Sequence, residues 1–109
     1  MPTISQASNL LTEIVVFTVE RAQQQALFDA IVSDTDQWIK RRPGFLSASF
    51  HKNLDETKVV NYAQWRSLSD WQGFMEDPQR TALGEKLKQL NVKANEFDSY
   101  QVQCVIEAP

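Results

Sequence analysis

The hydrophobic positions of this chain follow two periods in turn, and these periods predict the order of its elements. Residues 11–19, LTEIVVFTV, are dominated by β-branched side chains and predict a first strand. Residues 22–41 then carry one stripe at helical spacing, made by Leu27, Ile31, Thr35 and Trp38. The dipeptide Pro43-Gly44 ends this predicted helix.

Two further strands and a second helix are predicted downstream. Residues 42–65 alternate in polarity on both sides of the segment 55–58, Asp-Glu-Thr-Lys, and predict a hairpin. Ser67 and Asp70 have the spacing of a capping box, which opens a helix. The dipeptide Asp77-Pro78 breaks that helix in two.

The end of the chain completes the pattern. A last helical segment carries Leu83, Leu87 and Leu90, and residues 97–107 alternate again as a fourth strand. The order βαββαβ is typical of the α+β ferredoxin-like fold, which has a four-stranded antiparallel sheet with helices on one face. We expect one such domain at residues 11–109, after a flexible polar arm at residues 1–10.

The hairpin can be divided into two faces. If its turn has an even number of residues, so that Leu54 lies opposite Val59, Ala48 pairs with Trp65 and Phe50 with Ala63. One face is then apolar except for an amide, and it contains Leu46, Ala48, Phe50, Val59, Asn61, Ala63 and Trp65. A three-residue turn would instead bring His51 beside Asn61. The even turn separates polar from apolar residues better, so we prefer it.

Asn61 is the residue that this face assignment singles out. A buried amide is costly unless something hydrogen-bonds to it, and its partner is either a neighbouring main-chain group or a small-molecule ligand. Trp65 lies four residues further along the strand, about 13 Å away at the usual rise of a strand. The two side chains are therefore placed to frame a flat, extended ligand, unless Trp65 is an ordinary core residue.

The sheet predicts a partner subunit as well. Ile, Val and Phe occur at both parities in the first and last strands, so the face without helices is also apolar. Large exposed apolar surfaces are rare on monomers, and we expect a homodimer that packs sheet against sheet.

Composition narrows the class of partner and the compartment. The chain has 11 basic and 14 acidic residues, and neither this balance nor any long basic block suggests nucleic acid or an anionic membrane as partner. Its longest apolar run is too short to span a bilayer. The single cysteine, Cys104, excludes an internal disulfide and indicates a reducing compartment, so we expect a cytoplasmic protein. Cys104 alternates with Val102 and Ile106, and we expect it to be a buried packing residue.

These residues resemble a known family. The segment Arg42-Pro43-Gly44-Phe45, the hairpin, and the element Asn61-x-x-x-Trp65 before a capped helix are similar to the antibiotic biosynthesis monooxygenase family, in particular its cofactor-free anthrone oxygenases. The resemblance covers about residues 11–107. It implies a dimeric α+β barrel with one pocket in each subunit, between the helices and the sheet.

The resemblance also implies roles for individual residues. Asn61 and Trp65 correspond to the strand residues that contact substrate, and Trp71 to an aromatic residue that lines the pocket. We expect Asn61 and Trp65 to be catalytic: the Asn61 amide would hydrogen-bond the substrate oxyanion, and the Trp65 indole N–H would donate to the peroxide or a carbonyl. Phe74 occupies the position where many relatives carry histidine, so the acid/base partner is left unassigned. Trp71, Phe74 and Phe50 would supply flat apolar walls. The one histidine, His51, lies on the mixed face of the hairpin, and we expect it to be structural or exposed.

The implied chemistry needs no cofactor. A deprotonated phenol or anthrone can pass an electron to O₂ by itself, so an aromatic substrate and O₂ give a quinone-type product without flavin or metal. A non-catalytic dimer that binds a quinone or phenol is the alternative. A haem-degrading oxygenase is a further alternative, but it would need an axial histidine between Ser67 and Leu90, and that segment has none.

Overall fold

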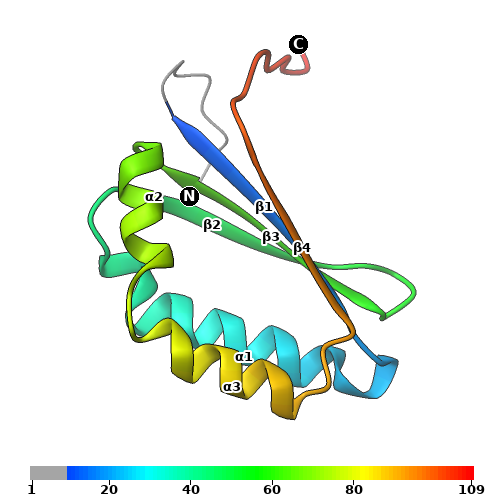
Figure 1. Cartoon of the computed structure of the whole chain (residues 1–109). Helices are drawn as coiled ribbons and strands as arrows, with labels where there is room; N and C mark the ends of the chain where they lie inside the picture. Colours follow the sequence, from blue (N-terminus) through cyan, green and yellow to red (C-terminus); the bar gives the residue numbers. More distant parts are fainter. Residues whose placement is uncertain (1–9) are drawn as a thin grey trace.

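The computed structural model describes residues 10–109, and the predicted arm therefore lies almost wholly outside the described residues. Four antiparallel strands form one sheet in the order β2-β3-β1-β4 (Figure 1). Their bounds are β1 Leu11–Thr18, β2 Phe45–Lys52, β3 Lys58–Trp65 and β4 Ala94–Tyr100. This order is that of a ferredoxin-like sheet, so the predicted fold is confirmed.

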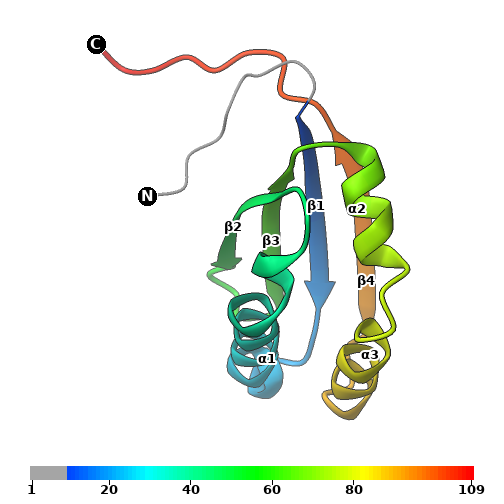
Figure 2. The ribbon, with the colours of Figure 1, turned by 90° about the vertical axis from the view of Figure 1, so that its left-hand side faces the viewer.

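The helices cover one face of the sheet. They are α1 Gln24–Gln37, α2 Leu68–Met75 and α3 Arg80–Gln89, and short 3-10 turns, η1 Arg21–Gln23 and η2 Ile39–Arg41, flank α1. Viewed from this side, α1 lies towards β2 and β3, whereas α2 and α3 lie towards β1 and β4 (Figure 2). Within residues 10–109, no helix is long and apolar enough to cross a membrane.

Two apolar clusters join the helices to this inner face. The first is centred on Leu27 and Ile31 of α1, which are almost fully buried against Phe17 and Val59. The second contains Leu11, Ile39, Ala63 and Trp65. The predicted stripe of α1 therefore packs on the sheet, and burial of its side chains contributes roughly 1.5–3 kcal/mol for each large residue.

The hairpin has the predicted parity but a different register. Phe50 pairs with Asn61 and Ala48 with Ala63, so the expected pairing of Ala48 with Trp65 is wrong by two residues. A shift of two keeps every side chain on its face, because side chains in a strand alternate with period two. His51 pairs with Val60, on the opposite face from Asn61.

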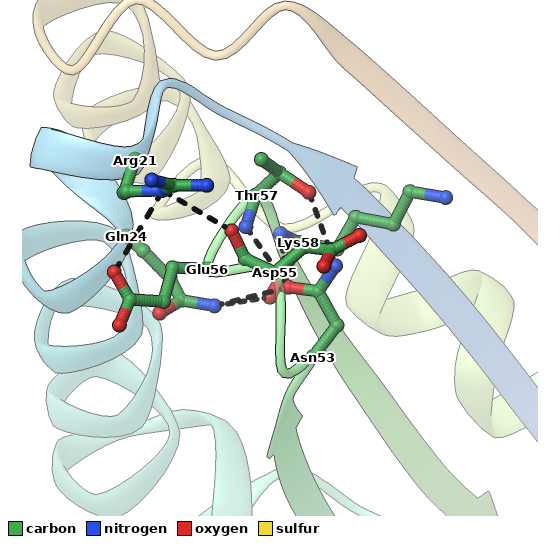
Figure 3. Close-up of polar contacts among 7 residues, drawn as sticks. All are labelled: Arg21, Gln24, Asn53, Asp55, Glu56, Thr57 and Lys58. Carbon is green, nitrogen blue, oxygen red and sulfur yellow. Dashed lines mark hydrogen bonds and ion pairs between the residues drawn. The ribbon is translucent and has the colours of Figure 1, made fainter.

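The register is set by the turn at residues 53–58, which is built around one side chain. The Asn53 N–H donates a hydrogen bond to the Lys58 carbonyl at 3.3 Å, so four residues, 54–57, lie within this turn, an even number as expected. The Asn53 carboxamide oxygen accepts hydrogen bonds from the backbone N–H groups of Thr57 and Lys58, at 2.9 and 2.8 Å. The Gln24 amide donates to the Lys58 carbonyl at 2.8 Å and so ties the turn to the start of α1 (Figure 3). Polarity alone predicted the parity of this hairpin, but only these contacts fix its length.

A β-bulge in β2 changes which residue occupies one position of the predicted apolar face. The pairing shifts between Phe45 and Ser47, so that Phe45 lies opposite Trp65 and Leu46 is the extra residue. Leu46 is 42% exposed, whereas the Phe45 ring packs edge-on against Trp65 with centroids 5.3 Å apart. Phe45 therefore takes the inner position that the sequence pattern assigned to Leu46.

The last strand begins and ends earlier than predicted. Its ladder with β1 ends at the pair Thr12–Tyr100, and residues 101–109 have no regular secondary structure. Cys104 is exposed, so the expectation of a buried cysteine is wrong. Alternation of Val102, Cys104 and Ile106 suggested a strand, but a strand also needs a partner with free backbone groups.

The entry to α2 depends on a close approach of two segments. The Ser67 hydroxyl accepts a hydrogen bond from the Asp70 backbone N–H at 3.1 Å, which confirms the predicted cap. Gly44 has φ +82°, and its carbonyl accepts a hydrogen bond from the Arg66 N–H at 2.7 Å. A Cβ atom on Gly44 would lie 2.2 Å from an Asp70 carboxylate oxygen. The Pro-Gly element thus has a steric reason for its glycine.

We predict that Gly44→Ala lowers the free energy of unfolding by at least about 1–2 kcal/mol, because alanine is strained at positive φ and its methyl group meets Asp70. Gly84→Ala is the matched control: this helical glycine has open space around its Cβ position, so alanine should add about 0.5–1 kcal/mol. Urea denaturation measures both values. Equal stability of Gly44→Ala and the wild-type protein would contradict the steric argument.

Candidate active site

Asn61 lies in the middle of the inner face of the sheet. One row of side chains crosses this face, with Phe50 on β2, Asn61 on β3, Val15 on β1 and Phe97 on β4 as successive cross-strand partners. Directly opposed residues of one row lie within contact distance of each other. The amide is therefore surrounded on the sheet by apolar side chains, as the face assignment predicted.

A cavity of about 120 Å³ lies between this face and the helices. It is lined by Glu13, Val15, Phe17, Ile31, Thr35, Ile39, Asn61, Trp71, Phe74, Met75, Arg80, Leu83, Leu87, Asn95 and Phe97. An apolar cavity of about 150 Å³ holds one benzene molecule, whereas pockets for drug-sized ligands start near 300 Å³. The enclosed space therefore matches about one aromatic ring. Phe97 is 52% exposed, so the cavity reaches the surface beside β4.

The Asn61 side chain has a free acceptor inside this cavity. Its amide oxygen is buried and has no hydrogen-bond partner among the described residues. A neighbouring main-chain group therefore does not satisfy this oxygen, which was one of the two alternatives open from the sequence. Leaving such a group unpaired costs about 1–3 kcal/mol, and a ligand that donates a hydrogen bond would remove that cost.

A second polar residue, Glu13 on β1, faces the same cavity. Glu13 is only 2% exposed, and neither of its carboxylate oxygens makes a hydrogen bond to the described residues. Glu13 pairs with Ala63, which places Asn61 diagonally across the ladder, roughly 7–8 Å away between Cα atoms. An unpaired buried carboxylate is unusual, because a charge away from water needs a partner.

Burial is the main cause of a raised pKa at Glu13. The side chain of Ser99, the cross-strand partner of Glu13, can donate a hydrogen bond to the ionised form and lowers this pKa in part, and the negative charge of Asp98 on β4 raises it. The net direction is upward, so the Glu13 carboxylate is a stronger base than a glutamate in water.

Sequence reasoning missed Glu13, although the sequence contained a signal for it. Within the strand LTEIVVFT, Glu13 has the same parity as Leu11, Val15 and Phe17, all of which face the helices. An acidic residue at an inner position of a central strand is an exception to the usual burial pattern. Looking for paired carboxylates and motifs does not detect such a single residue.

Two aromatic side chains of α2 form a flat wall of the cavity. Trp71 packs against Phe97 with ring centroids 6.3 Å apart, and Phe74 stacks on Trp65 at 5.3 Å and an interplanar angle of 22°. The Arg80 guanidinium lies over the Phe74 ring, 5.5 Å from its centroid, and donates a hydrogen bond to the Met75 carbonyl at 2.8 Å. A positive charge is thus held at the edge of an otherwise aromatic wall.

The structure separates the residues that the sequence singled out. Asn61, Trp71 and Phe74 line the cavity. Trp65 is 2% exposed and lies behind Phe74, so it contacts the wall without being among the lining residues. Phe50 lines a separate, open hollow along β2, because its strand is at the edge of the sheet away from β1 and β4.

His51 lies on the outer face, where it is exposed and hydrogen-bonded to the Ser49 hydroxyl at 3.1 Å. Its placement is that expected of a residue on the mixed face of the hairpin. Among residues 10–109, no cluster of three or more histidine, cysteine, aspartate or glutamate residues is arranged to hold a metal ion.

Comparison with known proteins identifies the family. Residues 10–86 match the model of the antibiotic biosynthesis monooxygenase family. Tetracenomycin-F1 monooxygenase from Streptomyces glaucescens is 45% identical over 78 residues, which are 72% of this chain and 70% of that protein. The match to the family model covers β1 to the middle of α3, and so includes Glu13, Asn61 and Trp71.

Solved structures have the same fold. The monooxygenase from the ActVA-Orf6 gene of Streptomyces coelicolor, in complex with nanaomycin D, is 32% identical with a TM-score of 0.82 over 91% of this chain and 92% of that one. SnoaB, a cofactor-independent oxygenase from Streptomyces nogalater, is 18% identical with a TM-score of 0.74 over 92% and 99% of the two chains. The chain therefore belongs to the antibiotic biosynthesis monooxygenase family, and the expected enzyme class, a monooxygenase, is confirmed.

Proposed function

We propose that this monooxygenase oxidises an electron-rich phenol or anthrone with O₂ to a quinone, without a cofactor. The observation that carries the proposal is the cavity, which has space for about one ring between aromatic walls and two buried polar side chains without partners. A hydroxylated aromatic ring satisfies both features. The ActVA-Orf6 protein with its nanaomycin D ligand and the cofactor-independent SnoaB support this substrate class and this mode of oxidation.

The reaction balances without an external reductant. The substrate CH₂ group loses two hydrogen atoms and gains one oxygen atom to become a carbonyl, and the second oxygen atom leaves with those hydrogens as water. All four electrons that reduce O₂ come from the substrate. The protein must therefore bind the ring, stabilise the oxyanion from which electrons leave, and keep bulk water away while a peroxide forms and collapses.

The residues around the cavity suit these tasks. The Asn61 amide carries both an acceptor and two donors, so it can hold a phenolic hydroxyl and then the oxyanion that replaces it. Trp71 and Phe74 provide flat surfaces for the ring, and Trp65 supports Phe74 from behind. Trp65 thus acts through Phe74 in this proposal, and Phe50 acts by packing beside Asn61 as its cross-strand partner.

A polycyclic substrate is larger than the enclosed space, so it enters with one ring. The remaining rings lie at the mouth, against the half-exposed Phe97. This arrangement fixes the reacting ring by contacts on all sides while leaving the far end of the substrate loosely specified.

We predict O₂ uptake when the protein is mixed with hydroxyanthrones, at a rate that a metal chelator does not change and that added flavin does not raise. The physical reason is that the substrate itself supplies the electrons. An oxygen electrode and absorbance of the quinone product measure the reaction. Binding of these compounds without O₂ uptake would favour a non-catalytic role, and uptake that requires flavin or metal would contradict the cofactor-free mechanism.

We predict that Asn61→Ala lowers the rate of hydroxyanthrone oxidation about 10²-fold, because loss of one oxyanion donor typically raises the barrier by about 3 kcal/mol. Gln72→Ala is the control: it also removes an amide, but from an exposed position on α2 between the two wall residues. Thermal unfolding checks that both variants fold. A wild-type rate in Asn61→Ala would remove Asn61 from the mechanism.

The homodimer belongs to the same proposal. The outer face of the sheet carries no helix and presents partly buried apolar residues, among them Ile14 and Val16 of β1 and Tyr62 of β3. A second copy packed on this face would cover them. Cys104 is exposed and free, which suits the reducing compartment expected for a cytoplasmic enzyme.

We predict that the protein sediments with twice its chain mass of 12.5 kDa, and that Tyr62→Glu shifts it to the monomer by placing a charge in the outer face. Leu54→Glu introduces the same charge at a fully exposed position of the hairpin connection and should leave the dimer intact. Analytical ultracentrifugation reports both. A wild-type monomer at micromolar concentration would contradict the sheet-to-sheet dimer.

A further inference from the structure

We propose that Glu13 is the catalytic base of this site, and that its carboxylate takes the proton from a phenolic or enolic hydroxyl of the ring bound in the cavity. The inference rests on the proposed function and names the group that the sequence left unassigned. It also defines the ligand as a neutral aromatic ring that brings its own hydrogen-bond donors.

The unpaired polar atoms point to a ligand with hydroxyl groups. In the described part of the chain, four buried side-chain polar atoms have no hydrogen-bond partner, and three of them are oxygens on Glu13 and Asn61. Both residues line the same cavity between sheet and helices. Acceptors are satisfied only by donors, so a ring with two hydroxyl groups completes the site. A ligand that arrived as an anion would instead be repelled by the carboxylate.

Among the described residues that line this cavity, Glu13 alone carries a carboxylate, histidine or other side chain that readily accepts a proton. The other ionisable residue among the lining residues is Arg80, whose guanidinium stays protonated in proteins. His51 is exposed on the opposite face of the sheet. Asn61 and Trp71 do not titrate in the physiological range. The placement of side chains thus leaves one candidate for the base.

The charges nearest to Glu13 come from two other elements: Asp98 of β4, which lies opposite Ile14 on the outer face, and Arg80 of α3, which lines the cavity. Asp98 on β4 interacts unfavourably with the ionised carboxylate, and Arg80 on α3 places a positive charge on the cavity wall. Before proton transfer the negative charge is on Glu13, and afterwards it is on the substrate oxygen. The proton moves between two groups of the same cavity, so the cavity holds the same net charge throughout the transfer.

The proton-transfer step balances. The O–H bond of the substrate breaks, its electron pair stays on the oxygen as phenolate or enolate, and a new O–H bond forms on Glu13. The electron-rich anion then reacts with O₂. When the peroxide collapses, its O–O bond and the remaining C–H bond break and the carbonyl forms. The departing oxygen takes the hydrogen from that carbon and the proton from Glu13 to become water, and the carboxylate is restored.

Burial tunes this residue for the task. Because the pKa of Glu13 is raised, the carboxylate is closer in basicity to a phenolate than a glutamate in water is, and proton transfer is less uphill. Below the raised pKa, Glu13 is protonated and cannot accept the proton. The oxidation rate should therefore rise with pH through the pKa of Glu13.

Glu13→Gln is the decisive variant. It keeps the size and polarity of the side chain but cannot accept a proton, so we expect a 10²–10⁴-fold loss of hydroxyanthrone oxidation and loss of the rising limb of the pH profile. Glu13→Asp keeps a carboxylate and should retain that limb at a lower rate. Glu85→Gln, at an exposed position of α3 outside the cavity, is the control and should match the wild-type protein.

A readout without turnover separates this inference from the proposed function. A hydroxyanthraquinone is already oxidised, and its visible absorption shifts when its hydroxyl becomes phenolate. In the wild-type protein, ionised Glu13 accepts a hydrogen bond from the dye hydroxyl and repels its phenolate, so we expect the bound dye to shift to the phenolate spectrum at a higher pH than the free dye. This displacement should be lost in Glu13→Gln.

The pH dependence of unfolding provides a third measurement. The raised pKa means that the folded state holds the Glu13 proton more tightly than the unfolded chain. Its contribution to stability is full below about pH 4.3, the usual value for glutamate, and is lost as pH rises through the folded pKa. Glu13→Gln should abolish this part of the pH dependence.

The outcomes distinguish the two proposals. If Glu13→Gln oxidises hydroxyanthrone at the wild-type rate and with the wild-type pH profile, Glu13 is not the base, and the proposed function still stands. If no tested anthrone is oxidised but the dye shift occurs and is lost in Glu13→Gln, the proposed function fails while Glu13 remains the proton acceptor. An unshifted dye in the wild-type protein would also count against Glu13.

Discussion

The alignment of β3 with its two neighbours is the constraint on which the site depends. A slip of one residue would move Asn61 from the inner to the outer face and bring polar groups under the helices. The Asn53 turn fixes β3 against β2, and the Gln24 contact fixes that turn against α1. The pairing of Asn61 with Val15 then aligns β3 with β1. Glu13 lies in the cavity because, in this β1–β3 ladder, its partner Ala63 and the residue Asn61 are on the same face of the sheet.

The cavity lies between apolar clusters that are well buried, and this makes its polar groups costly. Leu27, Ile31 and Val59 are almost fully enclosed on one side, and Ala63 and Trp65 on the other. Between them, the oxygens of Glu13 and Asn61 are withdrawn from water without partners. Without a ligand, an unpaired neutral group such as the Asn61 oxygen lowers the stability of the folded protein by about 1–3 kcal/mol, and a charged group lowers it by more. Their retention in an otherwise apolar interior is the pattern expected of a functional site rather than of a core.

The aromatic wall and the carboxylate have complementary roles in the proposed reaction. Phe74 is held by stacking on Trp65 and by the Arg80 guanidinium, so the surface that receives the ring is fixed before the substrate arrives. Fixed donors and acceptors need little reorganisation during reaction, which is the usual source of electrostatic catalysis in enclosed sites. The same enclosure raises the pKa of Glu13, so one physical feature both excludes water and strengthens the base.

The sequence by itself determined the fold class, the order of elements, the cap at Ser67 and the parity of the hairpin, because these follow from local periodicity and short-range chemistry. It also placed Asn61 on the inner face. Tertiary structure alone decided that the hairpin pairing is shifted by two residues and that Phe45 rather than Leu46 takes the inner position. It also decided that β4 ends at Tyr100 and that Cys104 is exposed. It also decided that Trp65 lies behind the cavity wall and that Glu13 and Asn61, 48 positions apart in the chain, share one cavity. The physical reason is that periodicity states which face a residue occupies, whereas a site requires residues of different strands to meet, and only the pairing of those strands decides which residues do.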